Sequence, residues 1–345
     1  MGFRVAMILD RSTDFSHIER GLSEMGVELW LEDCKTEEGV INTAQSADFI
    51  ITIVHVYPFT RNVLKALKRC KFIETLGVGY DGIDLEAAYD YGIGVINNND
   101  YHIEELSEHT LALMLASAKR IFRLDEIVKG KGDIPASKLA LRKTWYQMVR
   151  VKGKTLGLVG FGRIARAVAA KARSLGMRIV VYDPYVSQAT AEEFMAEKLS
   201  LEQLLAESDF VSIHAILTPE THHLIGPAQF KMIKRGAHII NTARGAIIDE
   251  AALCATLAEG TIAGAALDVT DQEPPAPDNP LMNFDNVILT GHSGHSSPES
   301  WQHRLDRPLA EIARVMRGEW PIGLINPEVK GKYTAKWGEM HDPSP

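Results

Sequence analysis

The sequence predicts an α/β protein built from two doubly wound parallel sheets. Short apolar segments alternate with amphipathic segments almost throughout, and the expected strands are apolar on both faces. Strands of that kind belong to parallel sheets that helices cover on both sides. The chain has 345 residues, more than a single hydrophobic core usually supports, so two domains are expected.

The first sheet is expected to contain five strands. The apolar segments that predict them are 4–9, 27–31, 49–54, 72–77 and 94–97. A long helix should follow, from about Ile103 to Arg123, because apolar and small residues recur there every three or four positions. The Gly- and Lys-rich segment 129–143 has no clear period, so we expect a surface excursion there.

The second sheet is expected to contain six strands, the number typical of a dinucleotide-binding domain. They are predicted at 155–159, 178–182, 209–214, 237–241, 264–269 and 286–290. Helices are expected between them, at 164–175, 201–207, 227–235 and 249–258. A last helix at 299–317 should lead into an irregular tail that ends at Pro345.

The composition argues against several classes of partner. The formal net charge is −8 and no cluster of Lys and Arg stands out, which argues against nucleic acid and anionic membranes. No apolar stretch reaches the ~18 residues of a membrane span. The three cysteines, Cys34, Cys70 and Cys254, are far apart and suggest neither a metal site nor a disulfide framework. We therefore expect idle thiols in a reducing cytoplasm.

A glycine fingerprint predicts the cofactor site. Gly160-Phe161-Gly162-Arg163-Ile164-Ala165 follows an expected strand and opens an expected helix. The first glycine makes a tight turn, the second lets the backbone approach a pyrophosphate, and Ala165 keeps the third position small. Asp183 ends the next strand, where a carboxylate would bond the ribose 2′-hydroxyl and repel a 2′-phosphate, which predicts NAD rather than NADP. The alternative for Asp183 is a turn residue ahead of Pro184.

Three later segments suggest a catalytic set. Arg244, Glu273 and His292 each follow an expected strand of the second sheet, so they should converge at its ligand-binding edge. A histidine suits proton transfer to or from a hydroxyl, a carboxylate behind it fixes its tautomer, and a guanidinium grips a carboxylate in a bidentate fork. Taken singly, the three could also be a surface ion pair, a loop acid and a loop histidine.

With these segments the chain resembles the D-isomer-specific 2-hydroxyacid dehydrogenase family over almost its whole length. The stretches that carry the resemblance are Gly77–Asp84, Glu108–Leu113, Leu158–Ala165, Leu217–Thr221, Asn241–Gly245 with Asp249 and Glu250, the Leu267-Asp268-Val269 run with Glu273-Pro274, and the His292 segment. The resemblance implies an NAD-dependent oxidoreductase that interconverts a D-2-hydroxy acid and its 2-oxo acid. It assigns the catalytic roles to Arg244, Glu273 and His292.

The resemblance also implies contacts with substrate and cofactor. Backbone N–H groups around Val78 and Gly79 would bind the substrate carboxylate. Thr110 and Asp268 would lie near the nicotinamide, with Asp268 on its carboxamide, and His214 and Thr242 would line the cofactor groove together with the fingerprint residues Arg163 and Ile164.

The family division of the chain is discontinuous. A flavodoxin-like substrate domain would comprise residues 1–104 and 293–345, and a Rossmann cofactor domain, residues 105–292, would be inserted into it. A homodimer through the cofactor domain is implied as well.

Some positions depart from the family pattern. Gly291 stands where Pro is common before the catalytic histidine, His295 where a small residue is usual, and Ile216 where Pro is usual. The turn at 97–101 is closer to the branch related to the carboxy-terminal binding proteins. These departures leave the substrate open, and His295 is either a substrate contact or an exposed loop histidine.

Two other functions remain open at this point. The chain could be an NAD-sensing binding protein, as carboxy-terminal binding protein corepressors are, or its hydride donor could be formate or phosphite. The expected pocket wall is the stretch from His55 to Phe59, with Tyr101 across from it. It contains no Arg or Lys, which predicts a substrate with a neutral side chain.

Overall fold

The structure, a computed structural model, describes residues 2–10, 14–53, 58–131 and 137–342. The chain divides into two compact units. Unit 1 contains Met1–Tyr101 and Ser297–Pro345, and unit 2 contains His102–Ser296. The sequence placed these boundaries after 104 and after 292. Unit 2 is thus an insertion in unit 1, and each unit has its own sheet.

Unit 1 contains a five-stranded parallel sheet in the order β2-β1-β3-β4-β5. This is the flavodoxin-like order, and it confirms the predicted class of this domain. The strands are β1 (Arg4–Ile8), β2 (Glu28–Glu32), β3 (Phe49–Thr52), β4 (Phe72–Thr75) and β5 (Gly94–Asn97).

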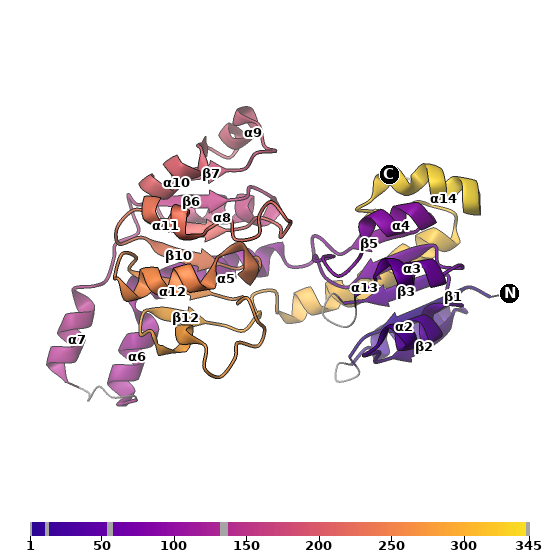
Figure 1. The fold of residues 1–345 in the computed structure, drawn as a ribbon, viewed down its shortest axis with the longest axis horizontal. Coiled ribbons are helices and arrows are strands. Elements are labelled where there is room, and N and C mark those ends of the chain that lie inside the picture. The colour runs from indigo at the N-terminus through magenta and orange to yellow at the C-terminus, as the bar shows by residue number, and fades with distance from the viewer. Residues whose placement is uncertain (1, 11–13, 54–57, 132–136, 343–345) are drawn as a thin grey trace. The chain divides into compact units, whose positions relative to one another are not determined.

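Helices cover both faces of this sheet, as Figure 1 shows. One face packs against α2 (Glu37–Ala44), α3 (Arg61–Ala66) and α4 (Leu85–Tyr91). The other packs against α1 (Ser16–Glu24), α13 (Pro298–Met316) and α14 (Lys330–Trp337), which a 3₁₀ turn at Pro327–Val329 precedes. The N-cap side chains of Thr36, Thr60 and Asp84 each accept a hydrogen bond from a backbone N–H in the first turn of their helix. These caps define the N-terminal ends of α2, α3 and α4.

Unit 2 contains a seven-stranded sheet in the order β12-β11-β10-β9-β6-β7-β8, in which the neighbouring strands pair in parallel. The strands are β6 (Thr155–Val159), β7 (Arg178–Tyr182), β8 (Glu197–Lys198), β9 (Phe210–Ile213), β10 (His238–Asn241), β11 (Gly264–Leu267) and β12 (Val287–Leu289). The order 3-2-1-4-5-6 of a Rossmann sheet is present, with one further strand beyond it, so the predicted fold class is confirmed.

Helices also cover both faces of the second sheet. One face packs against α10 (Leu201–Glu207), α11 (Pro227–Met232) and α12 (Glu250–Ala258). The other packs against α5 (Ile103–Lys119) and α8 (Arg163–Ser174). The remaining elements are α6 (Ile121–Lys129), α7 (Lys138–Trp145), α9 (Gln188–Glu193) and the 3₁₀ turns Gly245–Ile247 and Pro280–Asn283.

Four predictions about these elements were wrong. The second sheet has seven strands rather than six, because β8 is a two-residue edge strand with no apolar pattern. The helix expected to Arg123 ends at Lys119, since Arg120 takes a left-handed conformation (φ 53°) that neither Gly nor Pro signals. The segment 129–143 contains the start of α7, and the tail contains α14, whose Tyr333 packs on the ring of Phe72.

The parallel strands of unit 2 place their carboxyl ends at one edge of the sheet. The loops after β10, β11 and β12 therefore start side by side, although more than 20 residues separate each from the next. None of the helices in the described ranges is long and apolar enough to cross a membrane.

Candidate functional site

The glycine turn after β6 has the geometry that a dinucleotide needs. Gly160 has φ +88°, and a Cβ there would come within 2.6 Å of the backbone N of Ala215, so only glycine fits. A Cβ on Gly162 would meet nothing within 4 Å, and Gly162 begins α8 with no side-chain cap. The first turn of α8, which contains Arg163 and Ile164, lies at the positive end of the helix dipole, the end that suits an anionic pyrophosphate.

Asp183 follows β7 and holds this turn. One carboxylate oxygen accepts from the backbone N–H of Phe161 at 2.8 Å, and the other accepts from the N–H of Tyr185 at 2.8 Å. The turn role that the sequence offered as an alternative is thus present in the structure. Each oxygen can accept a second bond, so a ribose contact remains compatible with this geometry.

Three further predicted cofactor residues lie along the same edge of the sheet. His214 follows β9, and its Nε2 lies 2.9 Å from Ser212 Oγ; burial lowers the pKa of His214 to about 4, so its imidazole is neutral at pH 7. Thr110 on α5 and Thr242 after β10 lie with their hydroxyl oxygens 3.0 Å apart. Because Thr110 donates its own proton to the carbonyl of Leu106, Thr242 donates to Thr110.

His292 and Glu273 form a hydrogen-bonded pair. Nδ1 of His292 lies 2.7 Å from Oε2 of Glu273, and the two side chains are 29% and 30% exposed. An ionised carboxylate only accepts hydrogen bonds, so the proton of this bond belongs to Nδ1 and the neutral ring keeps a lone pair on Nε2. His292 has a left-handed backbone (φ 58°) directly after Gly291, which has φ 64°. That conformation is unfavourable for a side chain larger than glycine and must be held by its surroundings.

Asp268 holds the loop that contains His292. Its carboxylate accepts from Thr290 Oγ1 at 2.6 Å, from the N–H of Ser293 at 2.9 Å and from the N–H of Gly294 at 3.0 Å. Its backbone carbonyl accepts from the N–H of His292. His109 on α5 completes the cluster, with Nε2 3.0 Å from Thr290 Oγ1 and 3.4 Å from Asp268 Oδ1.

The protonation of Asp268 follows from these contacts. Burial alone would raise its pKa, but the hydrogen bonds from His109, Thr290 and the two N–H groups outweigh burial and hold the pKa well below its usual range. Asp268 is therefore a carboxylate at every pH at which the protein would function. Its two oxygens are directed at the His292 loop, and the nicotinamide contact implied by the resemblance stays a prediction.

Arg244 lies in the loop after β10, and its loop is joined to the other two. The carbonyl of Asn241 accepts from the N–H of Asp268 at 2.9 Å, and the Asn241 side chain donates to the carbonyl of Arg244 at 2.9 Å. A Cβ on Gly245 would overlap the backbone of Thr270, so this loop packs directly on the one after β11. The structure thus brings all three predicted catalytic residues to one edge of the sheet.

The predicted substrate residues of unit 1 lie after β4 and before α5. No described residue accepts from the N–H of Val78 or of Gly79, while the carbonyl of Val78 accepts from Asn97 Nδ2 at 2.8 Å. Two free neighbouring N–H groups suit an anion. Tyr101 is buried. His55, with Val56 and Tyr57, lies outside the described residues.

Sequence reasoning missed two residues near these sites. His109 is part of the Glu108–Leu113 stretch, but nothing in its spacing shows that it reaches the loop after β12. Arg304 on α13 donates from Nε to the carbonyl of Leu76 at 2.9 Å, and its guanidinium lies 5.8 Å from the ring centre of Tyr101. Arg304 and Leu76 are 228 positions apart in the sequence, and no sequence pattern connects them.

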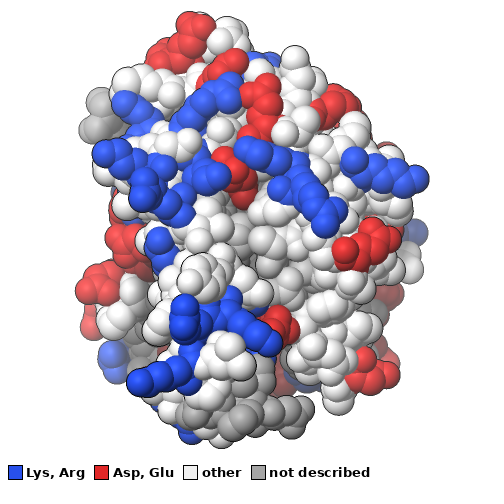
Figure 2. Space-filling model, turned by 90° about the vertical axis from the view of Figure 1, so that its left-hand side faces the viewer, with Lys and Arg blue, Asp and Glu red and all other residues white. Residues whose placement is uncertain are grey.

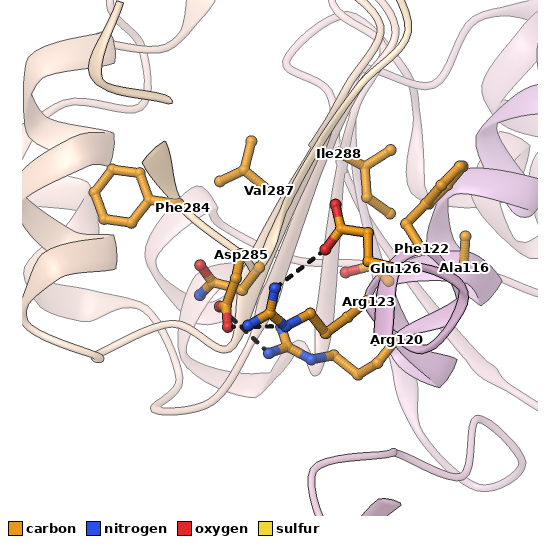
Figure 3. Close-up of a pocket in the computed structure, with 11 residues that line it drawn as sticks. Ala116, Arg120, Phe122, Arg123, Glu126, Phe284, Asp285, Val287 and Ile288 are labelled. Atoms are coloured by element: carbon orange, nitrogen blue, oxygen red, sulfur yellow. Dashed lines mark hydrogen bonds and ion pairs between the residues drawn. The ribbon is translucent and has the colours of Figure 1, made fainter. Parts of the chain in front are cut away.

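A separate pocket lies between the end of α5, α6 and the start of β12 (Figure 3). Its charged residues pair with one another: Asp285 contacts Arg120 at 3.5 Å and Arg123 at 3.4 Å, and Arg123 contacts Glu126 at 3.1 Å. These contacts attach α6 to the sheet. None of the predicted site residues lines this pocket.

Comparisons with known proteins agree with this arrangement. Residues 111–294 match the family model described as the D-isomer specific 2-hydroxyacid dehydrogenase, NAD binding domain. The chain is 36% identical over 321 residues to a glyoxylate reductase of Korarchaeum cryptofilum, covering 90% of this chain and 94% of the relative. It is 38% identical over 293 residues to a D-3-phosphoglycerate dehydrogenase of Methanocaldococcus jannaschii, covering 84% of this chain but 54% of that relative.

Solved structures show the same likeness. The D-lactate dehydrogenase of Aquifex aeolicus, in complex with NAD and lactic acid, superposes with a TM-score of 0.77 and 28% identity. The match covers 91% of this chain and 96% of that one. The cofactor prediction is confirmed at this level: unit 2 contains an NAD-binding domain.

Proposed function

Because the chain belongs to the D-isomer-specific 2-hydroxyacid dehydrogenase family, we propose that it reduces a 2-oxo acid to a D-2-hydroxy acid, and catalyses the reverse reaction, with Arg244, Glu273 and His292 as catalytic residues. Glyoxylate reductases among its relatives support a small 2-oxo acid as substrate.

The observation that carries the proposal is the 2.7 Å pair between His292 and Glu273. Because the carboxylate of Glu273 holds Nδ1, we assign the proton exchange with the substrate oxygen to Nε2. During reduction, protonated His292 gives its Nε2 proton to the oxygen that becomes the hydroxyl. During oxidation, neutral His292 takes that proton back.

The carboxylate of the substrate requires its own partners. Arg244, whose Nη1 donates to the carbonyl of Ala243 at 2.8 Å, would bind it through its guanidinium at the edge of the unit 2 sheet, and the N–H groups of Val78 and Gly79 would form an anion site in unit 1. Either kind of donor would hold the substrate carboxylate and so orient C2 of the substrate. Holding the substrate in one orientation lowers the activation barrier of hydride transfer, because the entropic cost of alignment is met on binding.

The glycine turn and its surroundings fit NAD. Gly160, Gly162, Arg163 and Ile164 would cradle the pyrophosphate, Asp183 would bond the ribose, and Thr110, His214, Thr242 and Asp268 would line the rest of the groove. When bound, the oxidised cofactor would accept the hydride from C2 of the hydroxy acid, and the reduced cofactor would supply it to C2 of the oxo acid. The carboxylate of Asp183 supports a preference for NAD over NADP.

The decisive experiment measures NADH oxidation by the purified protein with glyoxylate, pyruvate and hydroxypyruvate. Wild type should reduce at least one of them. His292→Ala and Glu273→Gln should lose most turnover, roughly a hundredfold or more for His292, while NADH still binds. His222→Ala, a change at an exposed histidine of the same unit, is the matched control.

Two results would contradict the proposal. Full activity in His292→Ala would remove that residue from the chemistry. NADH binding without turnover on any 2-oxo acid would instead favour the NAD-sensing binding protein considered from the sequence.

A homodimer through unit 2 is part of the proposal. Half of the exposed large apolar side chains among the described residues lie between 121 and 146, namely Ile121, Phe122, Val128, Leu139, Trp145 and Tyr146. Such a concentration marks an interaction surface. Figure 2 looks onto this end of unit 2, where uncharged side chains separate groups of Lys and Arg.

The attachment of α6 supports this surface. The ion pairs of Asp285 with Arg120 and Arg123 (Figure 3) fix the start of α6 against the sheet, so its apolar side chains are presented on a defined backbone. Sedimentation should show a dimer for wild type and for Ile322→Asp, an exposed apolar position of unit 1, but a monomer for Phe122→Asp. A monomeric wild type would end this part of the proposal.

We also place the protein in the cytoplasm. The support is that Cys34, Cys70 and Cys254 are all free thiols, two of them buried, as is usual for proteins of reducing compartments.

A further inference from the structure

Arg304 differs from the other arginines of its helix. Arg307 and Arg314 of this helix, and Arg317 directly after it, each lie within 4.0 Å of a carboxylate oxygen of Glu311 or Glu319. No carboxylate in the described parts of the chain lies that close to Arg304. Its contacts are one hydrogen bond, from Nε to the carbonyl of Leu76, and two aromatic rings.

This guanidinium is partly withdrawn from water. Arg304 is half-buried, and burial lowers its pKa, although an arginine keeps its charge at neutral pH. The rings of Tyr101 and Trp301 lie 5.8 Å and 5.3 Å from the guanidinium carbon and replace part of the lost hydration. A cation in such a place is stabilised further when an anion joins it.

The position of Arg304 links it to the proposed substrate. Leu76, whose carbonyl it binds, directly precedes the loop in which Val78 and Gly79 offer free N–H groups. Tyr101, over which the guanidinium lies, is the residue that the sequence placed in the pocket wall. Because Nε is bound to Leu76, the two terminal nitrogens are the donors that remain for a ligand.

We propose that Arg304 binds an anionic group on the substrate side chain, so that the preferred substrates are 2-oxo acids with a second acidic group. The inference rests on the proposed function, and it replaces the neutral side chain expected from residues 55–59. The terminal nitrogens of Arg304 form a planar fork that suits a carboxylate or a phosphate equally. The aromatic contacts keep the plane of the fork fixed before the substrate arrives.

Two matched substrate pairs test the charge and identify its source. Oxaloacetate and 4-methyl-2-oxopentanoate have side chains of the same shape, one ending in a carboxylate and the other in two methyl groups. 3-Phosphohydroxypyruvate and hydroxypyruvate differ by the phosphate. Wild type should favour the acidic member of one pair by at least about tenfold in kcat/KM, since hydrogen bonds to charged groups are the stronger ones.

Variants then assign this preference to Arg304. Arg304→Met keeps most of the apolar stem and removes the charge, so kcat/KM for the acidic substrate should fall about tenfold or more while the neutral partner changes less than about threefold. For Arg304→Lys, kcat/KM for the acidic substrate should lie between the values of wild type and Arg304→Met. Arg317→Met removes a charge from the exposed end of the same helix and should leave the preference unchanged.

Binding in the presence of NADH gives a readout that needs no turnover. N-oxalylglycine and N-ethyloxamate are unreactive mimics that differ in the terminal carboxylate. Wild type should bind N-oxalylglycine more tightly, and Arg304→Met should bind the two equally. Should the variant fail to fold, the wild-type preference between the two mimics still decides whether the side-chain site binds an anion.

The outcomes separate this inference from the proposed function. A wild type that reduces neutral 2-oxo acids at least as well as acidic ones overturns the role of Arg304 and leaves the dehydrogenase intact. Equal losses on both members of a pair in Arg304→Met also overturn it. A wild type that reduces no 2-oxo acid at all, yet binds NADH, overturns the proposed function first.

Discussion

Replacing Asp268 by Asn should loosen the loop that contains His292. The carboxylate accepts three hydrogen bonds at 2.6–3.0 Å and has His109 at 3.4 Å. An Asn amide can offer its oxygen at only one of the two carboxylate positions. With the oxygen at the Thr290 side, the NH₂ group faces the N–H of Gly294, donor against donor.

The magnitude follows from these contacts. Hydrogen bonds to a charged group contribute about 1.5–3 kcal/mol each, so losing one and weakening the others should cost about 2–4 kcal/mol. For a unit of this size that corresponds to a fall in Tm of about 5–15 °C. Release of the left-handed backbone at His292 should also lower kcat by roughly tenfold to a hundredfold, because the ring would no longer be held in one orientation.

The pH dependence of stability gives a second measurement. The pKa of Asp268 is lower in the folded protein than in the unfolded chain, so its charge stabilises the fold above the ordinary aspartate pKa. That advantage is lost as the pH falls through the folded-state pKa. The difference in Tm between wild type and Asp268→Asn should therefore be largest near neutral pH and shrink in strong acid.

Thermal unfolding and steady-state kinetics of three proteins test this reasoning. Asp271→Asn, the same substitution at an exposed position three residues later, is the control and should behave as wild type. An Asp268→Asn protein with the Tm and kcat of the control would refute the role of Asp268 in holding the loop. A loss confined to NADH affinity would instead support the carboxamide contact.

Three further predictions follow from the site. NADH should be used far better than NADPH, and Asp183→Ser should narrow the gap in kcat/KM; equal use of the two cofactors by wild type would contradict the ribose assignment. Arg244→Lys should raise KM for the oxo acid and lower kcat with NADH affinity nearly intact, because lysine lacks the planar fork, and a wild-type kcat/KM would remove Arg244 from the site. His109→Leu should lower both Tm and kcat, and His109→Gln, which keeps a donor near Nε2, should recover most of each. His238→Leu, which removes another imidazole bonded to α5, should lower Tm alone.

The fold was predictable because its signals are local. Buried parallel strands are continuous apolar segments, and the glycine turn stands between a strand and a helix. The topology then brings Arg244, Glu273 and His292 to one edge of the sheet, since parallel strands end at the same side. The sequence could therefore place these side chains together without any knowledge of their contacts.

What could not be predicted depends on tertiary contacts. The break at Arg120 has no Gly or Pro to mark it, and it coincides with ion pairs and hydrogen bonds to Asp285 and Gln147. Arg304 reaches Leu76 from a helix that follows the whole of unit 2. A pocket wall inferred from residues 55–59 alone could not include a side chain supplied by another part of the chain.

The contacts of α5 explain how three loops keep one geometry. Thr110 bonds Thr242 after β10, His109 bonds Thr290 after β12, and a Cβ on Gly294 would meet both Leu106 and His109 within 2.8 Å. The direction of these bonds is fixed by counting protons. Asp268 is a carboxylate and can only accept, so the hydroxyl of Thr290 must donate to it and can then only accept from His109.

His109 must therefore have its proton on Nε2. A change that moves this proton to Nδ1 would reverse the hydrogen bond between His109 and Thr290. The order runs from His109 through Thr290 to Asp268, and Asp268 also accepts from the backbone N–H groups of His292 and Ser293. A helix that supplies none of the proposed proton-transfer groups thus determines where the imidazole of His292, the proposed proton donor, lies. For that reason substitutions at His109 should affect turnover more than their distance from the substrate would suggest.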